Sequence, residues 1–177
     1  MDELALNILD IAYNSIRANA SLIQIHIEDS CVNNLISIDI IDNGYGMTKK
    51  QVDKVIDPFY TTRTTRSVGL GIPLFKQNAE LTGGMFSIDS EVNVGTHVKA
   101  EFVKDNIDTP MMGDIVDTIA TLIQANENID YEFIYKSDDI SFEMNTKDMK
   151  DILGEVKINE PEVILWLKEY IKEGLGK

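Results

Sequence analysis

The side chains best suited to chemistry lie on one face of the first predicted helix, over residues 2–18. Asp10, Asn14 and Arg17 follow one another at intervals of four and three residues, which places them in one stripe along that helix. An asparagine amide oxygen can bind Mg²⁺, which takes few protein ligands and bridges phosphates. A carboxylate one turn away can orient or deprotonate a group that attacks a phosphate. Taken alone, the stripe also fits a helix with a solvated polar face.

A second candidate carboxylate, Asp42, follows the strand pattern of residues 35–41. Three isoleucines alternate along that strand, and Asp42 has the same parity, so its side chain is directed toward the buried face. An unpaired charge there would be costly, so Asp42 needs a backbone donor or a ligand. The sequence Gly44-Tyr45-Gly46 follows at once and indicates a turn.

A basic, threonine-rich segment separates this turn from a second glycine pair, Gly69-Leu70-Gly71, which precedes a helical pattern. Two glycine turns around such a segment indicate a flexible lid over an anionic ligand. Neither pair completes the G-x-x-x-x-G-K-[ST] loop of P-loop proteins or the G-x-G-x-x-G dinucleotide fingerprint. Each pair alone also fits an ordinary hairpin or helix cap.

The charge of the chain is negative and uneven. The net charge is −14, from 16 basic and 30 acidic residues; residues 1–104 hold 9 basic and 13 acidic residues, and residues 105–177 hold 7 and 17. This balance argues against nonspecific nucleic-acid binding, which needs a basic face. No apolar run approaches the roughly 18 residues of a membrane span, so we expect no membrane insertion. Because Cys31 is the only cysteine, no intrachain disulfide can form, and we expect a cytoplasmic protein.

Hydrophobic periodicity predicts an α/β unit followed by a smaller acidic α+β unit. A composition shift around 105–113 places the boundary between residues 1–104 and residues 105–177. Thr146 and Asn159 are predicted to cap the last two helices. The predicted helices cover residues 2–18, 49–56, 71–81, 114–126, 146–153 and 160–173, and the predicted strands cover residues 22–28, 35–41, 85–90, 96–103, 131–135 and 140–144.

Five blocks of residues occur in a characteristic order. They are Asp10-x-x-x-Asn14-Ser15, Asp42-x-Gly44-x-Gly46-Met47, Asp57-Pro58-Phe59-Tyr60-Thr61-Thr62, Gly69-Leu70-Gly71 and Gly95-Thr96. Over residues 1–104 the sequence thereby resembles the ATP-binding domain shared by gyrase B, Hsp90, histidine kinases and MutL, the GHKL or Bergerat-fold superfamily. The resemblance implies a two-layer α/β sandwich with helices on one face of a mixed sheet. It also implies that the chain binds ATP or ADP together with Mg²⁺.

At the base end of the site, the resemblance implies that Asp42 accepts a hydrogen bond from the adenine amino group. Gly44 and Gly46 would let the backbone pass beside the base. Thr96 would help to close the adenine pocket, and residues 47–68 would form the ATP lid.

At the phosphate end, the resemblance implies that Asn14 ligates Mg²⁺ and that Asp10 activates water or an acceptor group. Arg17 would reach the same phosphates. Gly69 and Gly71 would hinge the lid and present the backbone amides of the following helix to the phosphates. The other residues expected to contact the nucleotide are Met47, Tyr60, Thr61, Thr62, Arg63, Arg66 and Leu70.

Two features favour the histidine-kinase branch: the motif at 58–62 and the basic residue three positions after Asn14. Asp10 departs from the glutamate that is usual in the hydrolysing members and is one methylene shorter. His26 and His97 are predicted on outward strand positions and are not expected to accept phosphate. Because the ATP-binding motifs begin in the first helix, we expect the acceptor on a separate partner protein, as for anti-sigma-factor serine kinases. An ATP-gated binding switch that regulates a partner, and a slow ATPase, remain open alternatives.

Overall fold

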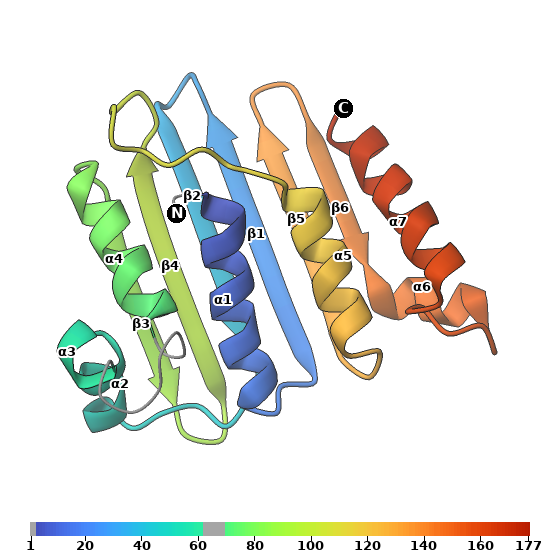
Figure 1. Cartoon of the computed structure of the whole chain (residues 1–177), viewed down its shortest axis with the longest axis horizontal. Helices are drawn as coiled ribbons and strands as arrows, with labels where there is room; N and C mark the ends of the chain where they lie inside the picture. Colours follow the sequence, from blue (N-terminus) through green and yellow to red (C-terminus); the bar gives the residue numbers. More distant parts are fainter. Residues whose placement is uncertain (1–2, 62–69) are drawn as a thin grey trace.

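One six-stranded mixed sheet, covered by helices on one face, organises the chain (Figure 1). The computed structural model describes residues 3–61 and 70–177, and within them the strand order is β3-β4-β2-β1-β5-β6. The helices are α1 (Leu4–Arg17), α2 (Lys49–Val55), α3 (Pro58–Thr61), α4 (Gly71–Leu81), α5 (Ile115–Ala125), α6 (Thr146–Leu153) and α7 (Pro161–Gly174). The strands are β1 (Leu22–Ser30), β2 (Leu35–Asp42), β3 (Met85–Glu91), β4 (Gly95–Val103), β5 (Asp130–Ser137) and β6 (Ser141–Asn145). The predicted two-layer α/β sandwich is confirmed.

The apolar core lies between the sheet and helices α1, α4, α5 and α7. Alternate isoleucines of β1 and β2 face these helices and are almost completely buried. Across the β2–β4 pair, Ile38 lies opposite Ala100 and Ile40 lies opposite Val98, so all four side chains enter the same layer. The period-two pattern of the sequence therefore fixed both the strands and the face that they bury.

The residues after position 105 continue the same sheet. Strand β5 pairs in parallel with β1, with Ile25 opposite Phe133, and β6 pairs antiparallel with β5. Helix α5 packs beside α1 on the same face. The buried side chains form one cluster that runs from Leu4 to Leu175. The division into residues 1–104 and 105–177 stays a prediction. In the structure, both parts contribute strands to one sheet and side chains to one core.

Two helix starts differ from the predicted caps. Thr146 is fully buried, and its Oγ1 accepts a hydrogen bond from the backbone N–H of Tyr131 at 2.8 Å. Asn145 caps α6 instead, because its side-chain oxygen accepts a hydrogen bond from the N–H two residues later. The predicted cap at Asn159 is wrong as well, since Glu160 is the N-cap of α7 and makes no side-chain capping bond. Tertiary contacts decided the first case, and the position of proline at the start of α7 decided the second.

The other face of the sheet is polar. His97 lies 2.6 Å from a carboxylate oxygen of Asp39, and His26 lies 2.8 Å from one of Glu132. Both histidines are therefore on the outward positions that strand alternation predicts, each beside an acidic partner. None of the helices in residues 3–61 and 70–177 is both long enough and apolar enough to span a bilayer.

Candidate functional site

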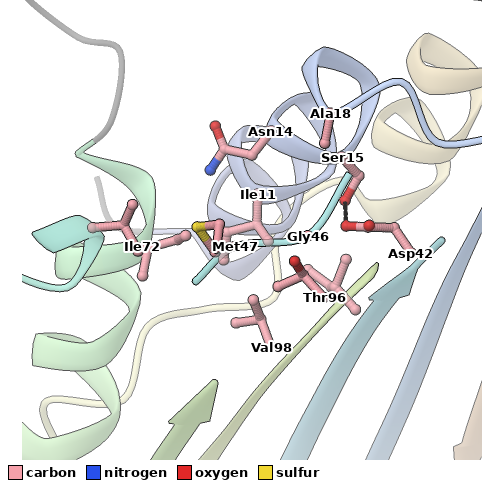
Figure 2. A pocket seen from close by; sticks show the side chains of 12 residues that line it. Ile11, Asn14, Ser15, Ala18, Asp42, Gly46, Met47, Ile72, Thr96 and Val98 are labelled. Carbon is pink, nitrogen blue, oxygen red and sulfur yellow. Dashed lines mark hydrogen bonds between the residues drawn. The ribbon is translucent and has the colours of Figure 1, made fainter. Parts of the chain in front are cut away.

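A cavity of about 150 Å³ opens between α1, the ends of β2 and β4, and the start of α4. Figure 2 shows Ile72 of α4 at one end of the cavity and Asp42 of β2 at the other. Most of the lining is apolar, with a few polar groups, which is the usual composition of a small-molecule site. The lining residues are Ile11, Asn14, Ser15, Ala18, Ile40, Asp42, Gly46, Met47, Val55, Ile72, Thr96 and Val98.

The carboxylate of Asp42 is held from two sides at the end of the cavity. The Ser15 hydroxyl of α1 donates a hydrogen bond to Oδ2 at 2.5 Å, and the Gly44 N–H donates to Oδ1 at 2.8 Å (Figure 2 shows the first of these). A carboxylate offers about four acceptor positions, and these donors occupy two. Asp42 therefore has the partners that its inward direction required and can still accept a hydrogen bond from a ligand.

The turn after β2 packs tightly between α1 and the β3–β4 turn. The Tyr45 N–H donates a hydrogen bond to the Ala18 carbonyl at 2.8 Å. Gly46 has φ +70, and a Cβ on it would lie 1.9 Å from the Glu91 carbonyl oxygen. A Cβ on Gly44 would lie 2.7 Å from the Cβ of Ala18. Both glycines are needed because the backbone approaches its neighbours so closely here.

Thr96 belongs to a short hydrogen-bonded chain on the β4 side of the cavity. The Ser90 hydroxyl lies 2.8 Å from the Thr96 hydroxyl and donates to the Gly95 carbonyl at 3.0 Å. The Met47 N–H donates to the Ser90 hydroxyl at 2.8 Å. This chain ties the cavity wall at Met47 to the strand that carries Thr96.

The polar stripe of α1 faces the start of α4. Arg17 Nη1 donates a hydrogen bond to Asn14 Oδ1 at 3.0 Å, so the amide oxygen already faces a cation. Asp10 lies directly beside Gly71, where a Cβ would come within 3.0 Å of the Asp10 Cβ. Asn7, one turn earlier, is buried and accepts a long hydrogen bond of 3.5 Å from Asn78 of α4. The stripe therefore borders α4 at Asn7 and Asp10, while the side chains of Asp10 and Arg17 stay exposed.

The Asp10 carboxyl has a perturbed pKa. Much of the side chain is exposed, yet desolvation by partial burial raises the pKa of the Asp10 carboxyl above its usual range. The Arg17 guanidinium acts in the opposite direction and is the smaller effect. A carboxylate with a raised pKa is a better proton acceptor near neutral pH.

The segment predicted as the lid is described in part. Its first helix, α2, starts with a capping box between Thr48 and Gln51 and has no buried residue. The next helix, α3, was not predicted; it begins at Pro58, after Asp57 accepts a hydrogen bond from the Phe59 N–H at 2.9 Å. Leu70 is the N-cap of α4, and its side chain makes no capping hydrogen bond. The backbone of residues 60 and 61 ends α3, and the predicted contacts Thr62, Arg63, Arg66 and Gly69 lie outside the described residues.

Sequence reasoning missed two serines that shape the site. Ser15 was part of the first motif but was assigned no role, although it is buried and bonded to Asp42. Ser90 was not identified at all. The position of Ser15, five residues after Asp10 on the same helix, is only a weak indication of a role in the site. The Ser90–Thr96 contact could be predicted only from the strand register, which pairs these two residues across β3 and β4.

The family of the chain is established by comparison with known proteins. The family described as histidine kinase-, DNA gyrase B-, and HSP90-like ATPase matches residues 1–106, which is more than half of the 177-residue chain. The chain therefore belongs to this family, as its motif order and its fold indicated.

Two of the similar proteins are kinases by name. The signal transduction histidine-protein kinase ArlS of Staphylococcus haemolyticus is 32% identical over 106 residues, which cover 57% of this chain and 23% of that kinase. Sporulation kinase D of Bacillus subtilis is 29% identical over 97 residues, which cover 55% of this chain and 19% of that kinase. The chain thus spans less than a quarter of the length of these relatives.

A solved structure supports the fold over the whole chain. The MutL ATPase domain of Aquifex aeolicus, complexed with ADP, aligns with a TM-score of 0.53 and 15% sequence identity. The alignment covers 100% of this chain and 70% of the MutL chain. Strands β5 and β6 and helix α7 are therefore included in the shared architecture.

Proposed function

We propose that this chain binds Mg-ATP in the cavity between α1, β2 and α4 and transfers the γ-phosphate to a separate protein. The observation that carries the proposal is the Asp42 carboxylate, which Ser15 and Gly44 fix at the cavity, while about half of its acceptor positions receive no donor from the described residues. An acceptor placed in this way suits the exocyclic amino group of adenine. The apolar walls suit the faces of the ring.

The phosphate end offers a set of groups that fits Mg²⁺ and phosphate. Asn14 supplies an amide oxygen, a ligand type that Mg²⁺ accepts, and this oxygen already faces the positive charge of Arg17. When bound, the metal ion would neutralise phosphate charge. Arg17 would contribute a second positive charge, and the start of α4, which the Leu70 side chain does not cap, would present backbone N–H groups.

Calorimetric titration with Mg-ATP tests binding, with two aspartates of β2 as a matched pair. Asp42→Asn should weaken binding roughly ten- to hundredfold, because a donor replaces the acceptor that faces the base. Asp39→Asn, on the opposite face and bonded to His97, should leave the affinity unchanged. If Asp39→Asn weakened binding as much as Asp42→Asn, the nucleotide would not lie in this cavity.

Asp10 is the proposed base that receives the proton of the acceptor group. Asp10→Asn should reduce phosphate transfer by at least about 100-fold while leaving Mg-ATP affinity nearly intact. The pKa of Asp10 is higher in the folded than in the unfolded state, so ionisation of Asp10 disfavours the folded state. The protein therefore loses stability as the pH rises through the folded-state pKa. At neutral pH, Asp10→Asn should therefore keep or increase the thermal midpoint. A lowered midpoint would indicate a structural role instead.

Transfer is distinguished from hydrolysis by following a radiolabelled γ-phosphate in the presence of extract proteins. A labelled partner band that disappears with Asp10→Asn supports transfer. Label that appears only as inorganic phosphate supports a slow ATPase.

A second candidate function is an ATP-gated switch, and the packing of α2 favours it. This helix has no buried residue, although Val55 at its end lines the cavity. A helix with so few buried contacts has a low local stability, so a ligand that touches Val55 can shift its position. Bound Mg-ATP without transfer or hydrolysis, together with increased hydrogen-exchange protection of α2, would support the switch.

A further inference from the structure

The last two helices carry an apolar surface at the sheet edge opposite to α2 and α3 (Figure 1). In α6, Met149, Ile152 and Leu153 are spaced to form one apolar stripe. Thr146 is the only buried residue of this helix, and Ile152 is 86% exposed. An amphipathic helix normally buries its apolar stripe, so α6 has an apolar face that the described residues leave partly uncovered.

Helix α7 presents two apolar stripes instead of one. Its buried residues Ile164, Leu167 and Ile171 face the core. A second stripe includes Trp166, which is 54% exposed and stacks on Tyr170 with ring centroids 5.2 Å apart. Exposed tryptophan and tyrosine are enriched where proteins bind other proteins.

The two apolar faces meet in a small hollow of about 70 Å³. We name this surface the α6–α7 groove; its lining residues are Met149, Ile152, Leu153, Ile158, Val163, Trp166 and Leu167. Every one of these side chains is apolar. The hollow can receive an apolar side chain of a partner but offers nothing to a charged one.

Two carboxylates flank the groove by helical spacing. Asp148 lies one turn before Ile152 on α6, and Glu162 lies one turn before Trp166 on α7. Within the described residues these two carboxylates form no ion pair, and Glu155 after α6 forms none either. We call this side of the groove its acidic rim.

Three lysines of the region pair with acidic residues outside α6 and α7, whereas Lys147 forms no ion pair among the described residues and lies on the side of α6 opposite to Met149. Lys150 pairs with Asp130, and Lys168 pairs with Asp117. Lys157 pairs with Glu127. The rim therefore attracts positive charge, and a second copy of this chain, with its net charge of −14, would meet repulsion.

We propose that the α6–α7 groove docks an amphipathic helix of a basic partner protein. One apolar side chain of that helix enters the hollow against Trp166 and Ile152, and lysine or arginine side chains beside it face the acidic rim. Helix-in-groove recognition joins apolar anchors with flanking charges in this way. The proposal does not rest on nucleotide binding, because the groove and the cavity lie on different parts of the sheet.

The chain carries its own reporter for the test, since Trp166 is its only tryptophan. The probe is a synthetic amphipathic peptide of leucine and lysine, about 14 residues long to match a typical helix. Titration should shift the Trp166 emission to shorter wavelength as water leaves the ring. A peptide with glutamate in place of lysine should bind at least about tenfold more weakly.

Two uncharged substitutions give the matched control. Ile152→Ser, in the groove, should weaken binding of the lysine peptide by on the order of tenfold. Leu165→Ser, on an outer face of α7 and 65% exposed, should leave it unchanged. Both sites are exposed, so both variants should fold as the wild type does.

Several results would overturn the proposal. Equal binding of the two peptides, or equal effects of the two variants, would mean that no specific groove is used. A Trp166 shift with anionic phosphatidylglycerol vesicles and none with the peptide would assign the surface to a membrane. A concentration-dependent dimer in sedimentation, abolished by Ile152→Ser, would assign it to a second copy of the chain.

Discussion

Two serine–aspartate pairs lie at opposite ends of the sheet and differ in one respect. At the cavity, the Ser15 hydroxyl donates to Asp42 at 2.5 Å, and one backbone N–H completes the set. At the other end, the Ser30 hydroxyl donates to Asp138 at 2.6 Å, and two backbone N–H groups, from Cys31 and Val32, donate at 2.8 and 3.2 Å. Asp42 faces a cavity, whereas Asp138 joins two turns.

The difference separates a binding carboxylate from a structural one. Both carboxylates are oriented by a buried serine, so the presence of that hydrogen bond does not indicate function. Among the described residues, Asp42 has fewer hydrogen-bond donors than Asp138, and a cavity lies in front of its remaining lone pairs. The donors around Asp138 lower the pKa of its carboxyl, and the Ser30 hydroxyl is the largest cause. These hydrogen bonds hold the turn after β1 to the turn after β5, so the Asp138 carboxylate has a structural role.

The comparison assumes that both pairs belong to one cooperative sheet, and Phe133→Ala tests this with the largest expected effect. Phe133 is 1% exposed and lies on β5, between β1 and β6. Its truncation should lower the free energy of unfolding by about 3–5 kcal/mol. Urea unfolding followed by circular dichroism and by Trp166 fluorescence should show one coincident transition.

The control for Phe133→Ala is its neighbour Ile134, which points to the polar face of the sheet and is only half-buried. Ile134→Ala should cost less than about 1.5 kcal/mol. Two separate transitions in either variant would mean that residues 105–177 fold independently, and the two ends of the sheet could then not be compared as parts of one unit.

The second prediction separates the two serines directly. Ser15→Ala leaves Asp42 with a single donor, so the carboxylate loses its fixed orientation, and Mg-ATP affinity should fall by on the order of tenfold. Ser30→Ala removes the same group from Asp138 and should leave the affinity unchanged. Calorimetry on both variants is the measurement. Equal losses of affinity would show that the sheet, and not the cavity, transmits the effect.

The smallest expected effect is a pH dependence at Asp138. A lowered folded-state pKa contributes stability above the unfolded value of about 3.9, and this contribution is lost as the pH falls through the folded pKa. The difference in urea midpoint between wild type and Asp138→Asn should therefore be largest above about pH 4 and shrink below it. Asp139→Asn is the control at neutral pH, because Asp139 receives no hydrogen bond among the described residues, and this variant should leave the urea midpoint close to that of the wild type.

Local sequence patterns predicted most helices and strands, but they could not predict which strands that are distant in sequence pair with each other. The isoleucines of β1 and β2 alternate, so both strands and their buried face follow from the sequence. The position of β5 beside β1 does not, because Gln24 and Glu132, which are hydrogen-bonded, are 108 residues apart. Thr146 illustrates the same limit, since its hydroxyl serves a neighbouring strand rather than its own helix.

The candidate site was predictable where a single segment determined it. Asp42 could be placed from parity alone, and Asn14 and Asp10 from helical spacing. Ser15 and Ser90 could not be assigned, because their roles depend on which segments meet across the cavity. The Asn14–Arg17 bond also went unpredicted, although the two residues lie one turn apart.

The parallel pairing of β1 with β5 has a consequence for synthesis of the chain. One edge of β1 has no partner until β5 has been made, and the interval from Ser30 to Asp130 is 100 residues. At about 5–20 residues per second, the ribosome needs roughly 5–20 s to synthesise this interval. During that time the isoleucine-rich strand β1 has an unpaired edge, which can serve as a template for aggregation. A fragment ending at residue 106, where the family match ends, would keep this edge permanently and should depend on chaperones to remain in solution.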